Sequence, residues 1–529
     1  MSNGCRIWSR ENPASAFDRL GEADDGAKVE NVDVSEQPAS SERRSSFNEL
    51  GELARSFIAG AFEALREEHV IPTPVFHPYI AVGRDYFGDT IRAVPAYRDL
   101  EGKLDETYPE RFGEPLKRRH AEFASSYIFS FLEACIARCG RARTFAADSA
   151  AVQDSIDELL AVLGTTTNEI VCCRHVSHVT TTSGDAQIAD VVVVPEADEW
   201  VRLLRRICAE IPGAATSWNR DDPQPYDPPH ALLITREMSE DPEPYEVANR
   251  LSRRLERFLF LIRLLTGGTA QSAYEISGAT TLVAPMNPQM STFRKGAPLV
   301  RRTVRLTGDE GPAFAALSDL IDAAEVKREG MVATSFDVAL IKFNRSYSGD
   351  SSYEHLVDLA TALEAALIGA EKETEGLTLR LRSRVAALLA TDDDPARALF
   401  RDVGLLYGLR SRLVHGGQIK EKDLRKDLLR ISTVPAENFD HRFSVALGHA
   451  VDRMRDLVRR AILVRLCLAA GPNPVWPFDG ETPVDAILSD DAQRASWRAR
   501  WHERLDELAV GYAGAPSRSA VDYLSQEDH

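Results

Sequence analysis

The chain has 529 residues, of which 44% are hydrophobic and 27% charged, a composition typical of a globular protein that buries a core. This length predicts roughly two to four domains. The net charge of −18 opposes generic nucleic-acid binding, which needs a basic surface, but it does not exclude a small local basic site.

Cysteine usage and the distribution of apolar residues indicate a compartment. The seven cysteines are odd in number and form no Cys-x-x-Cys pair, as expected for reduced thiols in a cytosolic protein. The first residues contain no apolar stretch like that of a signal peptide. The apolar run 258–265 is shorter than the roughly 20 residues that cross a bilayer. We therefore expect a cytoplasmic protein without a membrane partner.

The first third of the chain shows an uneven helical pattern. Residues 1–45 are polar and aperiodic, which predicts a disordered tail. Apolar residues recur at helical spacing from Ser46 to Leu65, and the pattern breaks at Ile71-Pro72-Thr73-Pro74. A loop-rich segment follows, and a long helix is expected over 116–138.

The middle of the chain changes to short β-branched runs. Strands are predicted at 169–173, 189–194, 231–235 and 280–283, with helices near 198–210 and 244–267. This mixture predicts an α/β or α+β region of unknown function over residues 46–310.

From about residue 335 the pattern is entirely helical. The predicted helices are 336–347, 355–370, 377–390, 395–415, 422–431 and 443–468. Asp394 is expected to cap the fourth helix, with Pro395 at its first position, and Gly416-Gly417 is a typical stop signal. We expect a helical bundle over 335–470 and a helical C-terminal tail over 471–529.

Five polar side chains gather at the end of the 395–415 helix. They are Tyr407, Arg410, Ser411, Arg412 and His415. Positions four apart lie about 40° apart around a helix, so Tyr407, Ser411 and His415 share one face, and Arg412 also reaches His415. Arg410 lies about 140° from His415 by the same geometry. These two converge only if the helix end bends or a second chain supplies one of them.

The chemistry of these side chains fits RNA cleavage. Arginine binds phosphate in a bidentate manner, and a histidine at a helix end is suited to proton transfer near neutral pH. RNA supplies its own nucleophile, the ribose 2′-hydroxyl. An Arg and a His therefore suffice for cleavage without a metal. The alternative interpretation is that both are solvated caps of the helix end.

The segment 407–416 resembles the Arg-x4-His signature of the HEPN superfamily, and most closely its Apea-like branch. There, a Tyr-x-x-Arg-Ser-x-x-x-His-Gly pattern closes a helix; Tyr407, Arg410, Ser411, His415 and Gly416 match it. The stretch 356–365, about fifty residues upstream, is similar to the core helix of that family. The resemblance covers residues 335–465. Ser411 occupies a position where many active members carry Asn, Asp or His.

This resemblance implies a helical bundle that forms a homodimer and brings two Arg/His sets together in one cleft. Many members are metal-independent endoribonucleases in phage defence or toxin systems. By resemblance, Arg410 would bind the scissile phosphate of RNA and His415 would act as acid and base, while the N-terminal region would sense a trigger or restrain the nuclease. For Asp358 and Glu364 we expect a structural role, such as a salt bridge to an arginine of the 395–415 helix. The alternative is an inactive HEPN module that binds a protein or nucleotide.

Local charge and metal-ligand residues complete the prediction. Residues 376–430 hold twelve Lys or Arg and seven Asp or Glu, a net charge of +5 in an acidic chain. Local RNA binding needs such a basic segment, although a solvated helix face has the same composition. Residues 172–178 contain two cysteines and two histidines, but neighbours on a strand face opposite ways. We expect neither a metal site nor a cofactor.

Overall fold

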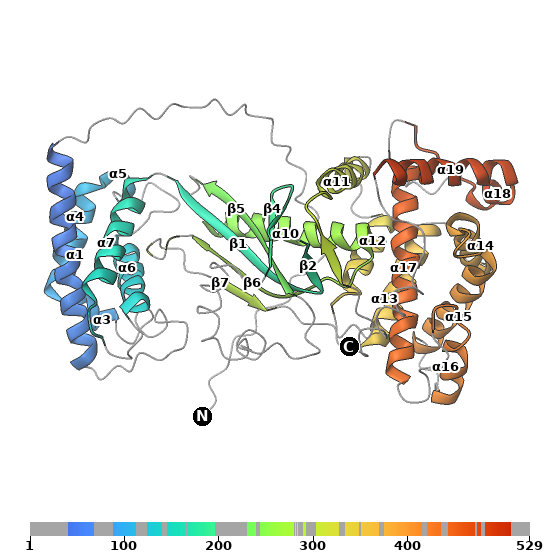
Figure 1. Ribbon diagram of the computed structural model, residues 1–529, viewed down its shortest axis with the longest axis horizontal. Helices are drawn as coiled ribbons and strands as arrows, with labels where there is room; N and C mark the ends of the chain where they lie inside the picture. The colour runs from blue at the N-terminus through green and yellow to red at the C-terminus, as the bar shows by residue number, and fades with distance from the viewer. Residues whose placement is uncertain are drawn as a thin grey trace.

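Figure 1 shows the computed structural model, in which a helical layer, a β-sheet and a second group of helices follow one another along the long axis. The structure describes residues 41–67, 88–112, 124–139, 145–165, 167–182, 184–195, 230–239, 244–279, 281, 283, 289–292, 303–326, 334–348, 351–369, 375–414, 420–434, 443–470, 473–477 and 482–508. The expected helix 198–210 and most of the expected tail 1–45 lie outside these residues. Within the tail, residues 41–45 belong to the first helix.

In the described residues up to 164, the regular secondary structure of the N-terminal layer is helical. Its helices are α1 (Ser41–Glu67), α3 (Gly88–Arg92), α4 (Pro95–Thr107), α5 (Pro109–Phe112), α6 (Ala124–Cys139) and α7 (Ser149–Gly164). The prediction of a loop-rich segment was wrong for residues 88–112, since α3 to α5 occupy it. Phe57, Phe62, Tyr127 and Phe131 are fully buried in a core that this layer shares with Val283. The layer thus has its own hydrophobic core.

The described strands form two sheets, a six-stranded antiparallel one and a two-stranded parallel one. The strands are β1 (Asn168–Ser177), β2 (Val179–Thr181), β3 (Ala186–Ile188), β4 (Val191–Pro195), β5 (His230–Ser239), β6 (Gln271–Ala279), β7 (Gln289–Thr292) and β8 (Val304–Leu306). Their order is β3-β4-β5-β1-β6-β7, and β2 pairs with β8 in parallel. Helix α10 (Pro244–Thr266) packs on β5, β1 and β6. The predicted mixed fold is confirmed. Because the six-stranded sheet is antiparallel, the described middle region is of the α+β class rather than α/β.

The predicted strands 169–173 and 231–235 are confirmed as parts of β1 and β5, and 189–194 is confirmed from Val191 on, since Ala189 and Asp190 form the turn before β4. The fourth, 280–283, was wrong for Thr281 and Val283, which lie in a bend and a turn after β6, and its other two residues lie outside the described ones. The β6 residues include few β-branched side chains. Their strand conformation comes instead from pairing with β1, from Ile170 opposite Ala279 to Ser177 opposite Gln271. Tertiary pairing has overridden local preference here.

The C-terminal helices follow the predicted pattern closely. They are α11 (Gly311–Val326), α12 (Ser335–Arg345), α13 (Ser352–Leu367), α14 (Leu377–Leu389), α15 (Ala396–Val414), α16 (Glu421–Leu428), α17 (Phe443–Ala469), α18 (Val484–Ser489) and α19 (Asp491–Glu507). Thr334 and Asp337 form a reciprocal capping box that starts α12. Helix α11 was not predicted. It packs between α10 and α17.

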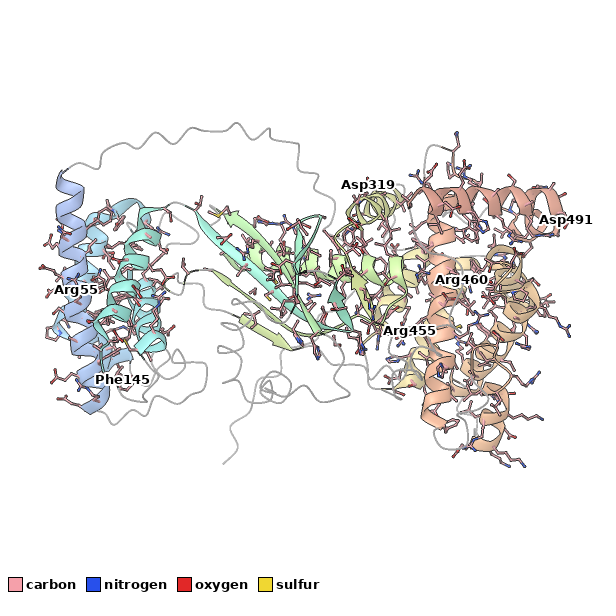
Figure 2. The ribbon with its side chains drawn as sticks, viewed as in Figure 1. Arg55, Phe145, Asp319, Arg455, Arg460 and Asp491 are labelled. Carbon is pink, nitrogen blue, oxygen red and sulfur yellow. The ribbon has the colours of Figure 1, made fainter. Side chains whose placement is uncertain are left out.

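Helix α17 joins the sheet to the bundle through buried arginines, two of which Figure 2 labels along its length. Arg455 donates to the carbonyl of Ser346 (2.5 Å) and Arg460 to that of Leu389 (3.0 Å), at the C-terminal ends of α12 and α14. Arg459 donates to Leu264 O (2.6 Å) at the end of α10. The last carbonyls of a helix have no partner within it, so each arginine provides a donor to a buried helix end. One continuous core extends from the sheet into the bundle.

Candidate functional site

The described part of the candidate site is the last two turns of α15. Helix α15 ends at Val414. Tyr407, Arg410, Ser411 and Arg412 all lie on it, whereas His415 lies outside the described residues together with Gly416 and Gly417. The predicted approach of Arg410 to His415 therefore stays a prediction, and so does the expected end of the helix at the glycine pair.

Tyr407 is fixed by Glu364 of α13. The Tyr407 side chain is buried, and its hydroxyl donates to Glu364 Oε2 at 2.7 Å. Burial, together with the hydrogen bond to Glu364, raises the pKa of Tyr407 to about 12. The phenol therefore stays protonated at neutral pH and acts as a donor. The expected salt bridge from Glu364 to an arginine of α15 was wrong, because the described partner of Glu364 on α15 is the Tyr407 hydroxyl.

Arg410 rests against the ring that Glu364 holds in place. Its Cζ lies 5.6 Å from the centroid of the Tyr407 ring, within the range of a cation–π contact. Its Nε is buried and has no hydrogen-bond partner among the described residues. A buried guanidinium donor without an acceptor is costly in free energy, and an anionic ligand would remove that cost. Arg410 is therefore the residue of this group that is suited to hold an anion.

Arg412 and Ser411 have different surroundings. Arg412 Nη2 donates to Asp427 Oδ2 of α16 at 2.6 Å, and Arg430 Nη1 lies 3.6 Å from the other oxygen of the same carboxylate. Arg412 thus joins α15 to α16 in an ion pair. The side chain of Ser411, which lies between Arg410 and Arg412 in the sequence, is half-buried.

Asp358 binds a different helix from the one expected. Its carboxylate accepts from Lys342 Nζ at 2.7 Å and lies 3.4 Å from Arg345 Nε, both on α12. The expected salt bridge to an arginine of α15 was therefore wrong. Because α12 and α13 are consecutive and packed together, the closest cations are those of α12. Asp358 ties these two helices together.

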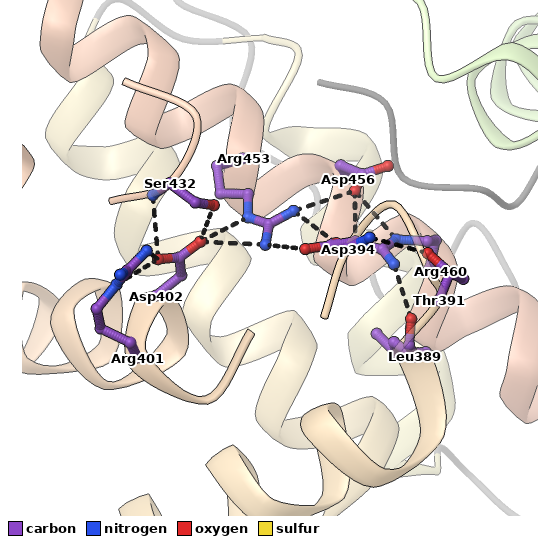
Figure 3. Close-up of polar contacts among 9 residues, drawn as sticks. All are labelled: Leu389, Thr391, Asp394, Arg401, Asp402, Ser432, Arg453, Asp456 and Arg460. Carbon is purple, nitrogen blue, oxygen red and sulfur yellow. Dashed lines mark hydrogen bonds and ion pairs between the residues drawn. The ribbon is translucent and has the colours of Figure 1, made fainter. Parts of the chain in front are cut away.

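A buried ionic network that the sequence did not predict holds the start of α15 (Figure 3). Asp394 accepts from both terminal nitrogens of Arg453, each at 2.8 Å, and from Arg460 Nη2 at 2.5 Å. Asp402 accepts from Arg453 Nε at 3.1 Å and from Ser432 Oγ at 2.5 Å. Asp394 was expected to cap α15, but its carboxylate lies against the α17 arginines instead. Asp402 lies on the apolar side of the helix, and this position was the signal in the sequence that could have indicated a buried ion pair.

Residues 172–177 belong to β1, in which Arg174 forms ion pairs, and His178 follows the strand. Arg174 is almost fully buried and pairs with Glu275 and with Glu256. The ring of His175 stacks on that of His230 with 4.7 Å between centroids. Burial raises the pKa of the Cys172 thiol, which disfavours a thiolate. Across the described part of the chain, no group of three or more His, Cys, Asp or Glu side chains has a metal-binding arrangement.

Several arginines of the basic segment 376–430 pair with carboxylates. Asp485 of α18 pairs with Arg380 and Arg384, and Asp427 pairs with Arg412 and lies near Arg430. Further pairs join Arg401 to Asp402 and Arg425 to Glu421. Asp402, Glu421 and Asp427 are already counted in the net charge of +5, and Asp485 is the one carboxylate of these pairs from outside the segment, so the segment stays basic. The cations outside these pairs matter most for a ligand.

Comparison with protein-family models, with curated proteins and with solved structures gave no match for this chain. The HEPN resemblance thus rests on the residues of 335–465 alone. In the described ranges, no helix combines the length and the apolar character needed to cross a membrane.

Proposed function

We propose that this protein is a metal-independent endoribonuclease of the HEPN type that acts as a homodimer. The observation that carries the proposal is the state of Arg410. Its guanidinium lies against Tyr407 with a buried Nε that has no acceptor in the described part of the chain. A scissile phosphate is an anion of the geometry that arginine binds best.

Each residue has a distinct part in the proposed reaction. The ribose 2′-hydroxyl attacks the adjacent phosphorus, so that the 2′-oxygen to phosphorus bond forms and the bond to the 5′-oxygen breaks. Arg410 neutralises the charge that develops on the phosphate oxygens. His415 accepts the 2′-hydroxyl proton or donates one to the leaving 5′-oxygen. Tyr407, held by Glu364, keeps the Arg410 side chain in place. The products are a cyclic phosphate and a 5′-hydroxyl.

The proposed dimer is supported by the spacing of Arg410 and His415 in the sequence. On a straight helix, positions five apart lie about 140° apart, which would separate the side chains of Arg410 and His415. Two copies that face each other would pair the Arg410 of one with the His415 of the other. The N-terminal layer and the sheet would then sense a trigger or restrain cleavage, in a phage-defence or toxin-like role, and the sheet shares one core with the bundle.

RNA degradation in EDTA tests the proposal. Purified wild-type protein is compared with Arg410→Ala, His415→Ala and Arg425→Ala, the last being a matched loss of one charge from a surface pair with Glu421. We expect cleavage by the wild type and by Arg425→Ala, with a loss of at least about a hundredfold in the other two. Equal degradation by all four proteins, or none by any, would favour the inactive HEPN module that binds a protein or nucleotide.

A further inference from the structure

We propose that Arg382 of α14 is a second phosphate-binding residue for single-stranded RNA, and that its supporting ring, Phe400, lies two helical turns before Tyr407 on α15. This inference rests on the proposed function, because it takes RNA as the ligand of Arg410. It extends the site from one phosphate to a track along α15.

The Arg382 guanidinium is held in a single position by Phe400. Its Cζ lies 3.9 Å from the centroid of the Phe400 ring, and its Nε donates to the Phe400 carbonyl at 2.9 Å. Its two terminal nitrogens have no hydrogen-bond partner within the described ranges. An arginine with its stem and Nε fixed, and its terminal nitrogens available, is preorganised for an external phosphate.

The arrangement repeats at Arg410. Phe400 and Tyr407 are seven residues apart on α15, which places them about 10.5 Å apart along the axis and within about 20° of one another around it. Each ring carries a guanidinium, Arg382 on the first and Arg410 on the second. Stacked nucleotides advance about 3.4 Å each, so the spacing of the two rings matches that of phosphates roughly three nucleotides apart.

Neighbouring arginines of α14 and α15 are placed differently. Arg380 and Arg384 pair with Asp485, and Arg401 pairs with Asp402. These cations are bound to carboxylates, whereas Arg382 and Arg410 lie on aromatic rings. A ring contact leaves the guanidinium edge available to a phosphate, so the choice of partner separates the structural arginines from the proposed ligand-binding ones.

Gly404 makes room for the Arg382 guanidinium. A Cβ at this position would lie 2.8 Å from both Cζ and Nε of Arg382, closer than real Cβ contacts. Gly404→Ala would therefore push the guanidinium off the Phe400 ring without removing its charge. A Cβ on Gly408, one turn further, meets nothing within 4 Å, which makes Gly408→Ala a matched control.

The experiment measures RNA affinity in the full-length chain. All proteins carry His415→Ala, which prevents cleavage, and the probe is a fluorescein-labelled single-stranded RNA of about twelve nucleotides read by anisotropy. We expect Arg382→Gln to raise Kd roughly tenfold, because one charge-assisted phosphate contact is lost. The slope of log Kd against log salt should fall by about 0.7, the value for one phosphate on a single strand. Gly404→Ala should also raise Kd, and Gly408→Ala should leave it unchanged.

The outcomes separate this inference from the proposed function. If His415→Ala protein binds RNA equally well with and without Arg382→Gln and Gly404→Ala, the assignment of Arg382 is overturned and the nuclease proposal stands. Absence of RNA binding also overturns it. If binding depends on Arg382 but wild-type protein leaves RNA intact, the nuclease proposal fails and the Arg382 assignment stands. Melting curves confirm that every variant is folded.

Discussion

Removal of the Asp402 carboxylate tests how α15 is held in the bundle. Asp402 and Arg453 are both fully buried, and Asp402 accepts from Arg453 Nε, from Ser432 Oγ and from Ser432 N. Asp402→Ala leaves the donors on Arg453 and Ser432 without this acceptor. Breaking a buried ion pair from one side costs about 3–5 kcal/mol. Because Arg453 keeps its two bonds to Asp394, the lower end, about 3 kcal/mol, is expected.

The assay is thermal unfolding of the full-length protein at neutral pH, followed by circular dichroism. A loss of about 3 kcal/mol should lower the melting temperature of the C-terminal unit by roughly 6–12 °C. Asp491→Ala is the matched control. Its side chain is 91% exposed and pairs with Arg494 on the surface, so a change below about 0.5 kcal/mol is expected. If Asp402→Ala melts within about 2 °C of this control, the network does not hold α15 as described.

Three further predictions concern single side chains. Tyr407→Phe removes the donor to Glu364 and should cost about 1 kcal/mol in a melting experiment while lowering RNA cleavage, since Arg410 loses a fixed support; unchanged cleavage would argue against that support. Burial raises the pKa of Glu133 to about 9, so the folded state binds a proton that the unfolded state releases above about pH 4.3. Glu133→Gln should therefore stabilise the N-terminal layer at pH 8, with the gain vanishing near pH 4; an equal effect at both pH values would contradict this. Burial lowers the pKa of His449, so its contribution to stability is present above about pH 6.5 and is lost as the pH falls below that value. His449→Gln should flatten the melting temperature between pH 7 and pH 5, and a profile parallel to the wild type would refute the assignment.

Periodicity predicted the C-terminal helices well because each buries a regular apolar stripe. Helices α12 to α17 lie within a few residues of the expected ranges. Local signals for α4 and α7 were present but unused: Pro95 starts α4, and Asp148 caps α7 by accepting from Ala150 N. Strand β6 had no such signal, because its conformation depends on pairing with β1 about one hundred residues away.

Most contacts of the candidate site could not be predicted, because they join residues that are distant in the sequence. Tyr407 and Glu364 were both predicted as site residues. Their hydrogen bond was not predicted, because the two residues are 43 positions apart and lie on different helices. Arg412 was predicted as a supporting residue of the site, and its pairing with Asp427 of α16 was not foreseen. The types of residue at a site are readable from a short motif. Which of them is engaged by the fold depends on tertiary packing, as for Arg410 and Arg412.

Cleavage by mixed dimers tests the central claim most directly. Arg410→Ala and His415→Ala proteins are each expected to be inactive on RNA in EDTA. If Arg410 of one copy acts with His415 of the other, an equimolar mixture that exchanges subunits contains one intact site in each mixed dimer, and about a quarter of wild-type activity should return. An inactive mixture, with mixed dimers shown to form, would contradict a site shared between two copies.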